Sequence, residues 1–435
     1  MKGNLKRIIA GTAAAAIVLT LSACGTARSG PVQTELSDAP VTIRMTWWGG
    51  DARHERTQQV IDLFEKAHPN ITVEPEFSDW NGYWEKLATS TAGKNSPDVM
   101  QMDQLYLASY ASRGTLVDLS KYDVGTTGME DSVLGMGRWD GGQYAIPIST
   151  TTMAFFVNND LLDQVGVPLP DDTDSWTWDE YDAWTKQVTE AAPQGAFGGA
   201  ILQNEFALQL YVRQHGGNLF EGNKVTADPK VVEGFFQQAL DQSKNGVAAP
   251  ASVWSENASL ALDQNPFSVG KLASMPSPST MISAYSASTG ADIRLVPMPN
   301  DADGTEKYDY FKPGMYWTAS SQSKHPAEAA ALIDFFLNDP EAVKILGTER
   351  GIPASATTID AIRDELTPAE LKAVEYAESR VPFLGNAPEI VPNGASDIES
   401  VMVRYLQEVL FERQSPADAA TALLAELQKS IDAAN

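Results

Sequence analysis

The sequence predicts an α/β fold in which parallel-type sheets are flanked by helices. Three observations predict it. Residues 41–47 alternate apolar and polar side chains, as strands do. A Gly49-Gly50 turn leads into apolar residues at helical spacing, a segment that ends before Pro69. The same strand–helix unit then recurs, and a βαβαβ order implies a parallel sheet with right-handed crossovers.

The next elements follow in order. Residues 71–74 form the second predicted strand, and the turn 79–82 precedes a helix that carries Tyr83 and Leu87. Residues 99–102 form a short buried strand. The helix after it contains Tyr106 and is expected to stop at Gly114, a residue typical of helix C-termini.

Four polar or aromatic residues follow these strands directly: Trp48, Asp51, Trp80 and Asp103. Because the carboxyl ends of parallel strands meet at one sheet edge, and open α/β sheets bind ligands there, we expect these side chains to converge on a site. Arg53 stands close by in the sequence. The alternative is a packed strand–turn–helix with Trp47 in the core.

The second half begins at a crossover near residues 149–152, before a predicted strand at 153–157. Thr177 and Glu180 have the spacing of a capping box. Four later helices are expected to start where a capping residue precedes proline, as it does at Asp228-Pro229, Asp339-Pro340, Thr367-Pro368 and Ser415-Pro416. The last 80 residues are predicted to be mostly helical.

Residues 1–23 have the pattern of an export signal, with a basic start and an apolar run too short to span a bilayer comfortably. Leu21-Ser22-Ala23-Cys24 resembles a bacterial lipobox, which implies lipidation of Cys24 and a membrane anchor. The alternative is an ordinary secretory peptide. Residues 24–40 are polar with glycine and proline, and are expected to be a flexible tether.

Composition excludes several classes. The formal charge is −26, and about −29 without the three basic residues of the signal, so a nucleic-acid partner is not expected. Cys24 is the only cysteine, which rules out an intrachain disulfide and a multi-thiolate metal site. The four histidines lack metal-ligand spacing. We therefore expect no metal and no cofactor.

The ordered set of motifs resembles the solute-binding lipoproteins of carbohydrate ABC importers. It comprises WWGG, PDVMQMD, YAIPISTTTMAFFVNND, SWTWDEY, KPGMYWTASSQSKHPAEAA and TERGIPAS, and covers essentially the whole mature chain. More narrowly, the chain resembles the family that includes maltose-, glycerol-phosphate- and oligogalacturonide-binding proteins. The resemblance implies a two-lobe periplasmic-binding-protein fold of type II. Its ligand cleft lies between the lobes and closes by a hinge motion.

The resemblance also implies boundaries and site residues. Residues 41–150 plus 310–352 would form the N-terminal lobe, and residues 153–305 plus 356–435 the C-terminal lobe. The implied ligand-binding residues are Trp48, Asp51, Arg53, Trp80, Asp103, Trp254, Trp317 and Arg350. The chain departs from the family after Gly270-Lys271, where the tryptophan of many members is missing. Trp254, Trp139 or Phe206 would have to replace that stacking ring.

Tryptophans and charged side chains suit a sugar, whose C–H faces stack on rings and whose hydroxyls bind polar groups. The expected function is capture of a sugar or oligosaccharide and delivery to the permease subunits of an ABC importer. The protein is expected to act as a monomer on the outer face of the cytoplasmic membrane. The alternatives are a surface-anchored hydrolase, which would use two positioned carboxylates, and an adhesive lipoprotein.

Overall fold

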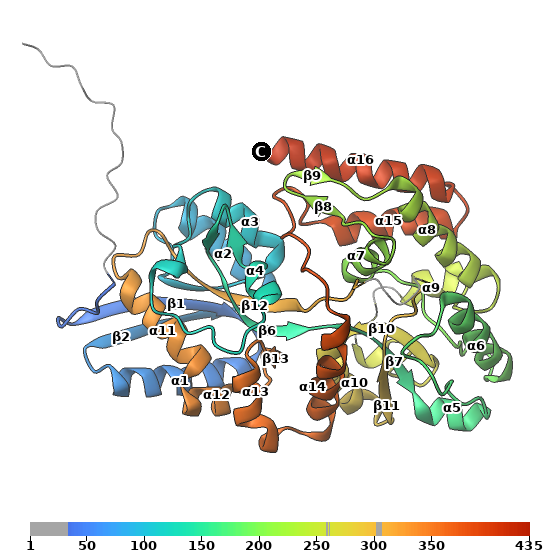
Figure 1. The fold of residues 1–435 in the computed structure, drawn as a ribbon, viewed down its shortest axis with the longest axis horizontal. Helices are drawn as coiled ribbons and strands as arrows, with labels where there is room; N and C mark the ends of the chain where they lie inside the picture. The colour runs from blue at the N-terminus through green and yellow to red at the C-terminus, as the bar shows by residue number, and fades with distance from the viewer. Residues whose placement is uncertain (1–33, 258–259, 261, 302–306) are drawn as a thin grey trace, which may run out of the picture. The chain divides into compact units, whose positions relative to one another are not determined.

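A computed structural model describes residues 34–257, 260, 262–301 and 307–435. The signal segment and Cys24 lie outside the described residues. Two sheets, each covered by helices, organise the described part of the chain (Figure 1). The first has six strands in the order β13-β6-β12-β3-β1-β2, and the second has three in the order β10-β7-β11.

The first sheet contains the predicted βαβαβ unit. β1 pairs in parallel with β2 on one side and with β3 on the other, as the alternating sequence predicts. The strands are β1 (Val41–Trp48), β2 (Ile71–Ser78), β3 (Val99–Met102), β6 (Ile146–Thr151), β12 (Lys312–Ala319) and β13 (Ile352–Pro353).

The pairing departs from the parallel prediction where the chain returns to this sheet. β12 lies antiparallel between β3 and β6, and β13 is antiparallel to β6. The chain enters β12 from the side of the second sheet, so the direction of β12 is opposite to that of β3 and β6. A strand inserted in this way between β3 and β6 is the type II arrangement.

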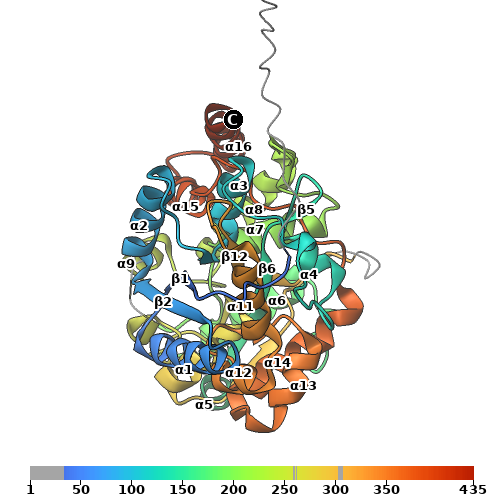
Figure 2. The same cartoon turned by 90° about the vertical axis from the view of Figure 1, so that its left-hand side faces the viewer.

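Two helical layers cover the first sheet. In Figures 1 and 2, α1 (Asp51–Ala67) and α2 (Trp80–Ala92) lie on opposite sides of β1 and β2. Ile43, Met45 and Trp47 pack with α1, α11 (Pro326–Asn338) and α12 (Pro340–Leu346), whereas Trp48 joins the cluster formed with α2 and α3 (Gln104–Ser112). Trp47 is therefore a core residue, fully buried, with Nε1 donating to His54 Nδ1 at 3.0 Å.

The second sheet is antiparallel throughout, which contradicts the prediction of parallel-type sheets in this half. β7 (Met153–Asn158) pairs with β10 (Ser274–Pro278) and with β11 (Ile293–Val296). Met153, Phe155 and Val157 of β7 point into one core, and Ala154 and Phe156 point into another. A strand buried on both faces is uniformly apolar, so its sequence carries no signal for the direction of its neighbours.

The predicted helix starts of the second half are confirmed. Thr177 and Glu180 form a reciprocal capping box at α6. In each of the four residue–proline pairs, the side chain of the residue before the proline caps a helix. The helices of this half are α5 (Asn159–Val165), α6 (Trp178–Ala191), α7 (Glu205–Gln214), α8 (Pro229–Lys244), α9 (Ala251–Asn257), α10 (Ile282–Thr289), α13 (Ala356–Ile362), α14 (Pro368–Arg380), α15 (Ile398–Leu410) and α16 (Pro416–Ala434).

The chain passes from the first sheet to the second with almost no connecting segment. Only Thr152 separates β6 from β7, and Figure 1 shows the two strands in sequence. Ser279, at the end of β10, receives a hydrogen bond from the backbone N–H of Thr152 at 3.3 Å. α13 packs against α12 and β13, although the prediction assigns residues 356–435 to the C-terminal lobe. The exact lobe boundaries stay a prediction.

Candidate functional site

The carboxyl ends of β1, β2 and β3 meet in a cluster of aromatic rings. The Trp48 ring lies 5.0 Å from Trp80 and 5.6 Å from Trp84, measured between centroids. Trp84 stacks on Tyr106 at 3.9 Å with an interplanar angle of 24°. Trp80 is 39 % exposed, so the cluster presents a ring to solvent. The predicted convergence of strand-end side chains is thus observed for Trp48 and Trp80.

Asp103 also lies at this edge, where it caps α3. Its Oδ1 accepts a hydrogen bond from the backbone N–H of Leu105 at 2.9 Å. Burial raises the pKa of the Asp103 carboxyl, while this backbone bond and the nearby Lys312 ammonium oppose the rise. Glu205 is a further charged neighbour and adds to the rise. Asp103 therefore belongs to a small charged group rather than standing alone.

The centre of that group is the ion pair between Lys312 Nζ, at the start of β12, and Glu205 Oε2, in the first turn of α7, at 2.6 Å. Their side chains are 20 % and 7 % exposed. The backbone N–H of Glu205 in turn donates to Glu399 Oε2 at 3.3 Å. Two acidic residues, Asp103 and Glu205, thus lie near Lys312, and Glu399 contacts the backbone of Glu205.

Arg53 and Asp51 occupy different environments at the start of α1. Asp51 is exposed in the first turn. Arg53 donates from Nε to both carboxylate oxygens of Glu349 at 2.9 Å and from Nη1 to the Trp48 carbonyl at 3.0 Å. Its guanidinium therefore braces the end of β1 against the segment before β13.

Trp317 and Arg350 are not at the surface, in contrast to the predicted ligand contact. Trp317 is 1 % exposed and its ring packs edge-on against Phe336. Arg350 lies over that ring at 5.3 Å, and its Nε and Nη2 donate to Gln101 Oε1 and Thr57 Oγ1. Burial lowers the pKa of Arg350 to about 9. Both residues support the first sheet from inside.

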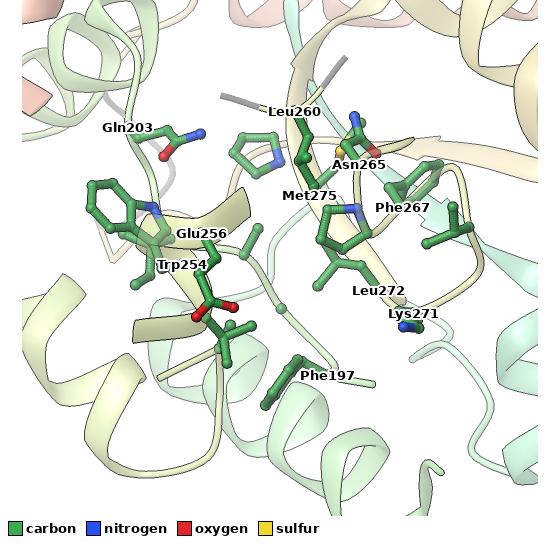
Figure 3. A pocket seen from close by; sticks show the side chains of 18 of the residues that line it. Phe197, Gln203, Trp254, Glu256, Leu260, Asn265, Phe267, Lys271, Leu272 and Met275 are labelled. Atoms are coloured by element: carbon green, nitrogen blue, oxygen red, sulfur yellow. The ribbon is translucent and has the colours of Figure 1, made fainter. Parts of the chain in front are cut away.

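A cavity of about 760 Å³ lies among residues of the second half of the chain. Figure 3 shows Gln203, Trp254 and Glu256 on one side of it, Asn265, Phe267 and Leu272 on the other, and Phe197 at its base. Rings and amides in one concave site are the usual lining of a small-molecule pocket. Its wall also includes Asn204, Lys271, Tyr285 and Glu399.

Two polar atoms of this wall lack a hydrogen-bond partner among the described residues. They are Trp254 Nε1 and Gln203 Oε1. Trp254 is 8 % exposed, and Figure 3 shows its nitrogen on the side of the ring that faces the cavity. Buried polar groups are nearly always paired, so these two atoms are exceptions among the residues that line the cavity.

The sequence did not identify most of this pocket. Trp254 was predicted, as a possible replacement for the missing tryptophan after Lys271. The other two candidates do not line the pocket: Phe206 is buried against Tyr310, and Trp139 packs on the first-lobe aromatic cluster. Phe197, Gln203, Glu256 and Glu399 come from loops and helix ends far apart in the chain, which no local pattern connects. Lys312 and Glu205, 107 residues apart, were missed for the same reason.

No group of three or more histidine, cysteine or acidic side chains in the described part of the chain is arranged to hold a metal ion. No helix in the described ranges is long and apolar enough to cross a membrane.

The fold and the pocket together define a two-lobed binding protein of type II. The family model of bacterial extracellular solute-binding proteins matches residues 51–343, and the chain belongs to this family. The family consists of binding proteins, which agrees with the expectation that the chain is not an enzyme and leaves the hydrolase alternative without support.

Curated relatives are distant. The diacetylchitobiose-binding protein DasA of Streptomyces coelicolor is 28% identical over 52% of this chain and 54% of its own length. The chain thus spans about half the length of this relative. The maltodextrin-binding protein MdxE of Bacillus subtilis is 22% identical over 86% of this chain and 87% of its own.

Solved structures cover more of the chain. A periplasmic oligogalacturonide-binding protein from Yersinia enterocolitica superposes with a TM-score of 0.76 at 25% identity, covering 90% of this chain and 99% of that one. A periplasmic solute-binding protein from Pectobacterium atrosepticum gives 0.78 at 25% identity, with 91% and 99% covered. The predicted two-lobe α/β fold is confirmed.

Proposed function

We propose that this protein captures a sugar or oligosaccharide outside the cell and delivers it to the permease subunits of an ABC importer. The observation that carries the proposal is the pocket of about 760 Å³, whose wall includes the indole N–H of Trp254 and the amide oxygen of Gln203, both without a partner among the described residues. A sugar hydroxyl can accept from the first and donate to the second. Three relatives are named for saccharides, and this supports the choice of ligand class.

The proposed site has two parts. The pocket with Trp254 is one, and the strand ends with Trp48, Asp51, Trp80 and Asp103 are the other. Asn204 lines the pocket, and the next residue, Glu205, pairs with Lys312 of β12, so the two parts adjoin through the start of α7. Arg53, Trp317 and Arg350 are assigned supporting roles, because their side chains are engaged within the first lobe.

Capture is proposed to involve a hinge motion at the crossovers near residues 149–152, 300–312 and 351–354. The proposed lobes are 41–150 plus 310–352 and 153–305 plus 356–435. In domain closure of this kind, a few residues take up the change in backbone angles. The single residue between β6 and β7 suits this role. Small-angle scattering with and without a binding sugar should give a smaller radius of gyration for the complex. An unchanged radius would argue for a rigid site.

A thermal-shift screen of the mature chain against neutral, amino and acidic oligosaccharides tests the function. A ligand that binds only the folded state raises the melting temperature by mass action. We expect a concentration-dependent rise with at least one sugar, and intact sugar after incubation. If no sugar in the panel raises the melting temperature, the proposal fails.

The anchoring is proposed from the lipobox-like segment at Cys24, which places the protein on the outer face of the cytoplasmic membrane, and one curated relative is described as a lipoprotein. We further propose that the protein acts as a monomer.

A further inference from the structure

The charges around the proposed site are strongly unequal. Glu256 and Glu399 line the pocket, and Glu205, a charged neighbour of Asp103, follows the lining residue Asn204 in the chain. Lys271 is the one basic residue among the described lining residues, and its side chain is exposed, as are those of Glu256 and Glu399. The wall therefore carries two negative charges and one positive charge.

Lys312, at the start of β12, is already neutralised. Lys312 Nζ lies 2.6 Å from Glu205 Oε2 in a largely buried pair. A ligand carboxylate that approached Lys312 would have to displace Glu205 or bring another anion beside Glu205 and Asp103. Like charges at such a site cost free energy, because little water is present to screen them.

A helix N-terminus with free N–H groups attracts an anion through those groups and its positive dipole end. At the start of α7, two of those N–H groups are occupied. Asn204 Oδ1 accepts from the backbone N–H of Ala207 at 2.7 Å, and Glu399 Oε2 accepts from that of Glu205. Glu399 thus takes the position that a ligand carboxylate would need.

The polar groups of the pocket favour a ligand that donates hydrogen bonds over an anion. Gln203 Oε1 needs a donor, and so do the carboxylates of Glu256 and Glu399 where they face the cavity. Hydroxyl, amide and ammonium groups can donate, whereas an ionised carboxylate cannot. Trp254 Nε1 needs one acceptor, which a hydroxyl also provides.

We infer that the site selects neutral or amino-bearing saccharides and rejects uronic acids, with Glu399 and Glu256 as the residues that set this selectivity. The inference rests on the proposed function and deepens it. The inference means that this protein and the oligogalacturonide-binding protein with the same fold bind ligands of different charge.

Matched sugar pairs test the inference on the full mature chain by calorimetric titration. The pairs are cellotriose with its C6-oxidised uronate, maltotriose with its C6-oxidised uronate, and α-1,4-galactotriose with trigalacturonate, with β-1,4-linked glucosamine trimer as the amino probe. In every pair of which a member binds, we expect the uronate to have a Kd at least ten-fold higher. A uronate that binds as tightly as its neutral partner, or more tightly, overturns the inference but leaves the proposed function standing. If no member of any pair and no amino probe binds, the proposed function itself fails.

A charge-removing variant assigns the selectivity to its residue. Glu399→Gln keeps an oxygen for the Glu205 N–H and removes one negative charge. We expect it to lower the ratio of the uronate Kd to the Kd of the neutral partner about five-fold. Glu190→Gln, at the exposed end of α6, is the matched control and should leave both unchanged. An unaltered ratio in Glu399→Gln would overturn the role of this carboxylate.

Discussion

Lys312 Nζ and Glu205 Oε2 lie 2.6 Å apart, joining the first residue of β12 to the first turn of α7. The pair links an element of the six-stranded sheet to an element of the second core. The ammonium also lies 5.2 Å from the centroid of Phe206, so it is held by charge and by a ring. Removing either partner would leave the other charge poorly solvated.

Lys312→Met should therefore destabilise the unliganded protein by about 1–3 kcal/mol, because it leaves Glu205 charged and largely buried beside Asp103. Adding Glu205→Gln should restore part of this loss. Urea unfolding of the two single variants and the double variant gives the coupling free energy. Lys244→Met breaks the exposed pair with Glu412 and should change stability by less than about 0.5 kcal/mol. Additive effects of the two buried substitutions would show that the pair is not coupled.

Trp80 and Trp317 should respond to alanine in opposite ways. Trp80 is 39 % exposed, so Trp80→Ala should leave the melting temperature close to wild type and raise the sugar Kd about 5- to 150-fold through the loss of a ring surface. Trp317→Ala empties a core site and should cost about 3–5 kcal/mol of unfolding free energy. Melting curves of both variants measure the loss of stability, and titrations measure the change in sugar Kd. Normal sugar binding by Trp80→Ala would remove that ring from the site.

Trp254→Phe isolates the unpaired indole N–H. The substitution keeps an aromatic ring and removes a donor that has no partner among the described residues. Removing an unpaired buried donor should not weaken the free protein by way of hydrogen bonding. We expect the sugar Kd to rise about 2- to 13-fold, the value of one hydrogen bond. A titration paired with a melting curve tests this, and an unchanged Kd would mean that the ligand does not accept from Trp254.

Asp182 should make stability depend on pH. Burial raises the pKa of its carboxyl from 3.8 to about 6, against the hydrogen bond that Gln242 donates at 2.8 Å. Between those values the folded protein holds a proton that the unfolded chain has lost, so this group's contribution to stability falls as pH rises from about 4 to 6. Asp182→Asn removes the effect. The variant should match wild type below pH 4 and exceed it in unfolding free energy above pH 6. A difference that does not vary with pH would contradict the assignment.

Cys24→Ala tests the proposed anchor. Without the thiol no lipid can be attached, and the protein should be released from the membrane fraction or remain unprocessed. Stable anchoring needs more than one acyl chain, which lipoprotein processing supplies. Cell fractionation and mass spectrometry of the N-terminus provide the measurement. A variant that is cleaved at the same site and still stays on the membrane would refute the anchor.

Local patterns explain what could be predicted from the sequence. The alternation in β1, the capping box at Thr177 and the capping residue before each of the four prolines are signals within a few residues, and the structure reproduces them. The convergence of Trp48 and Trp80 followed from the parallel pairing of β1 and β2.

The features that were missed depend on distant segments. β12 and β10 gave no sign of antiparallel pairing, because their residues, KPGMYWTA and SMPSP, carry no local signal for the direction of a neighbouring strand. Trp317 follows Tyr316 in β12, and both are buried, so alternation did not show which ring faces a ligand. The pocket wall joins Phe197, Trp254 and Glu399, which only the folded chain brings together.

The junction at Thr152 has a mechanical consequence. Because β6 and β7 are separated by one residue, a force that pulls the two sheets apart reaches the strands with no slack to absorb it. The load falls lengthwise on the hydrogen bonds of β6 with β12 and β13, and of β7 with β10 and β11. Several hydrogen bonds then share the tension at once. The junction therefore resists stretching along the strands, while the two sheets can still tilt about it.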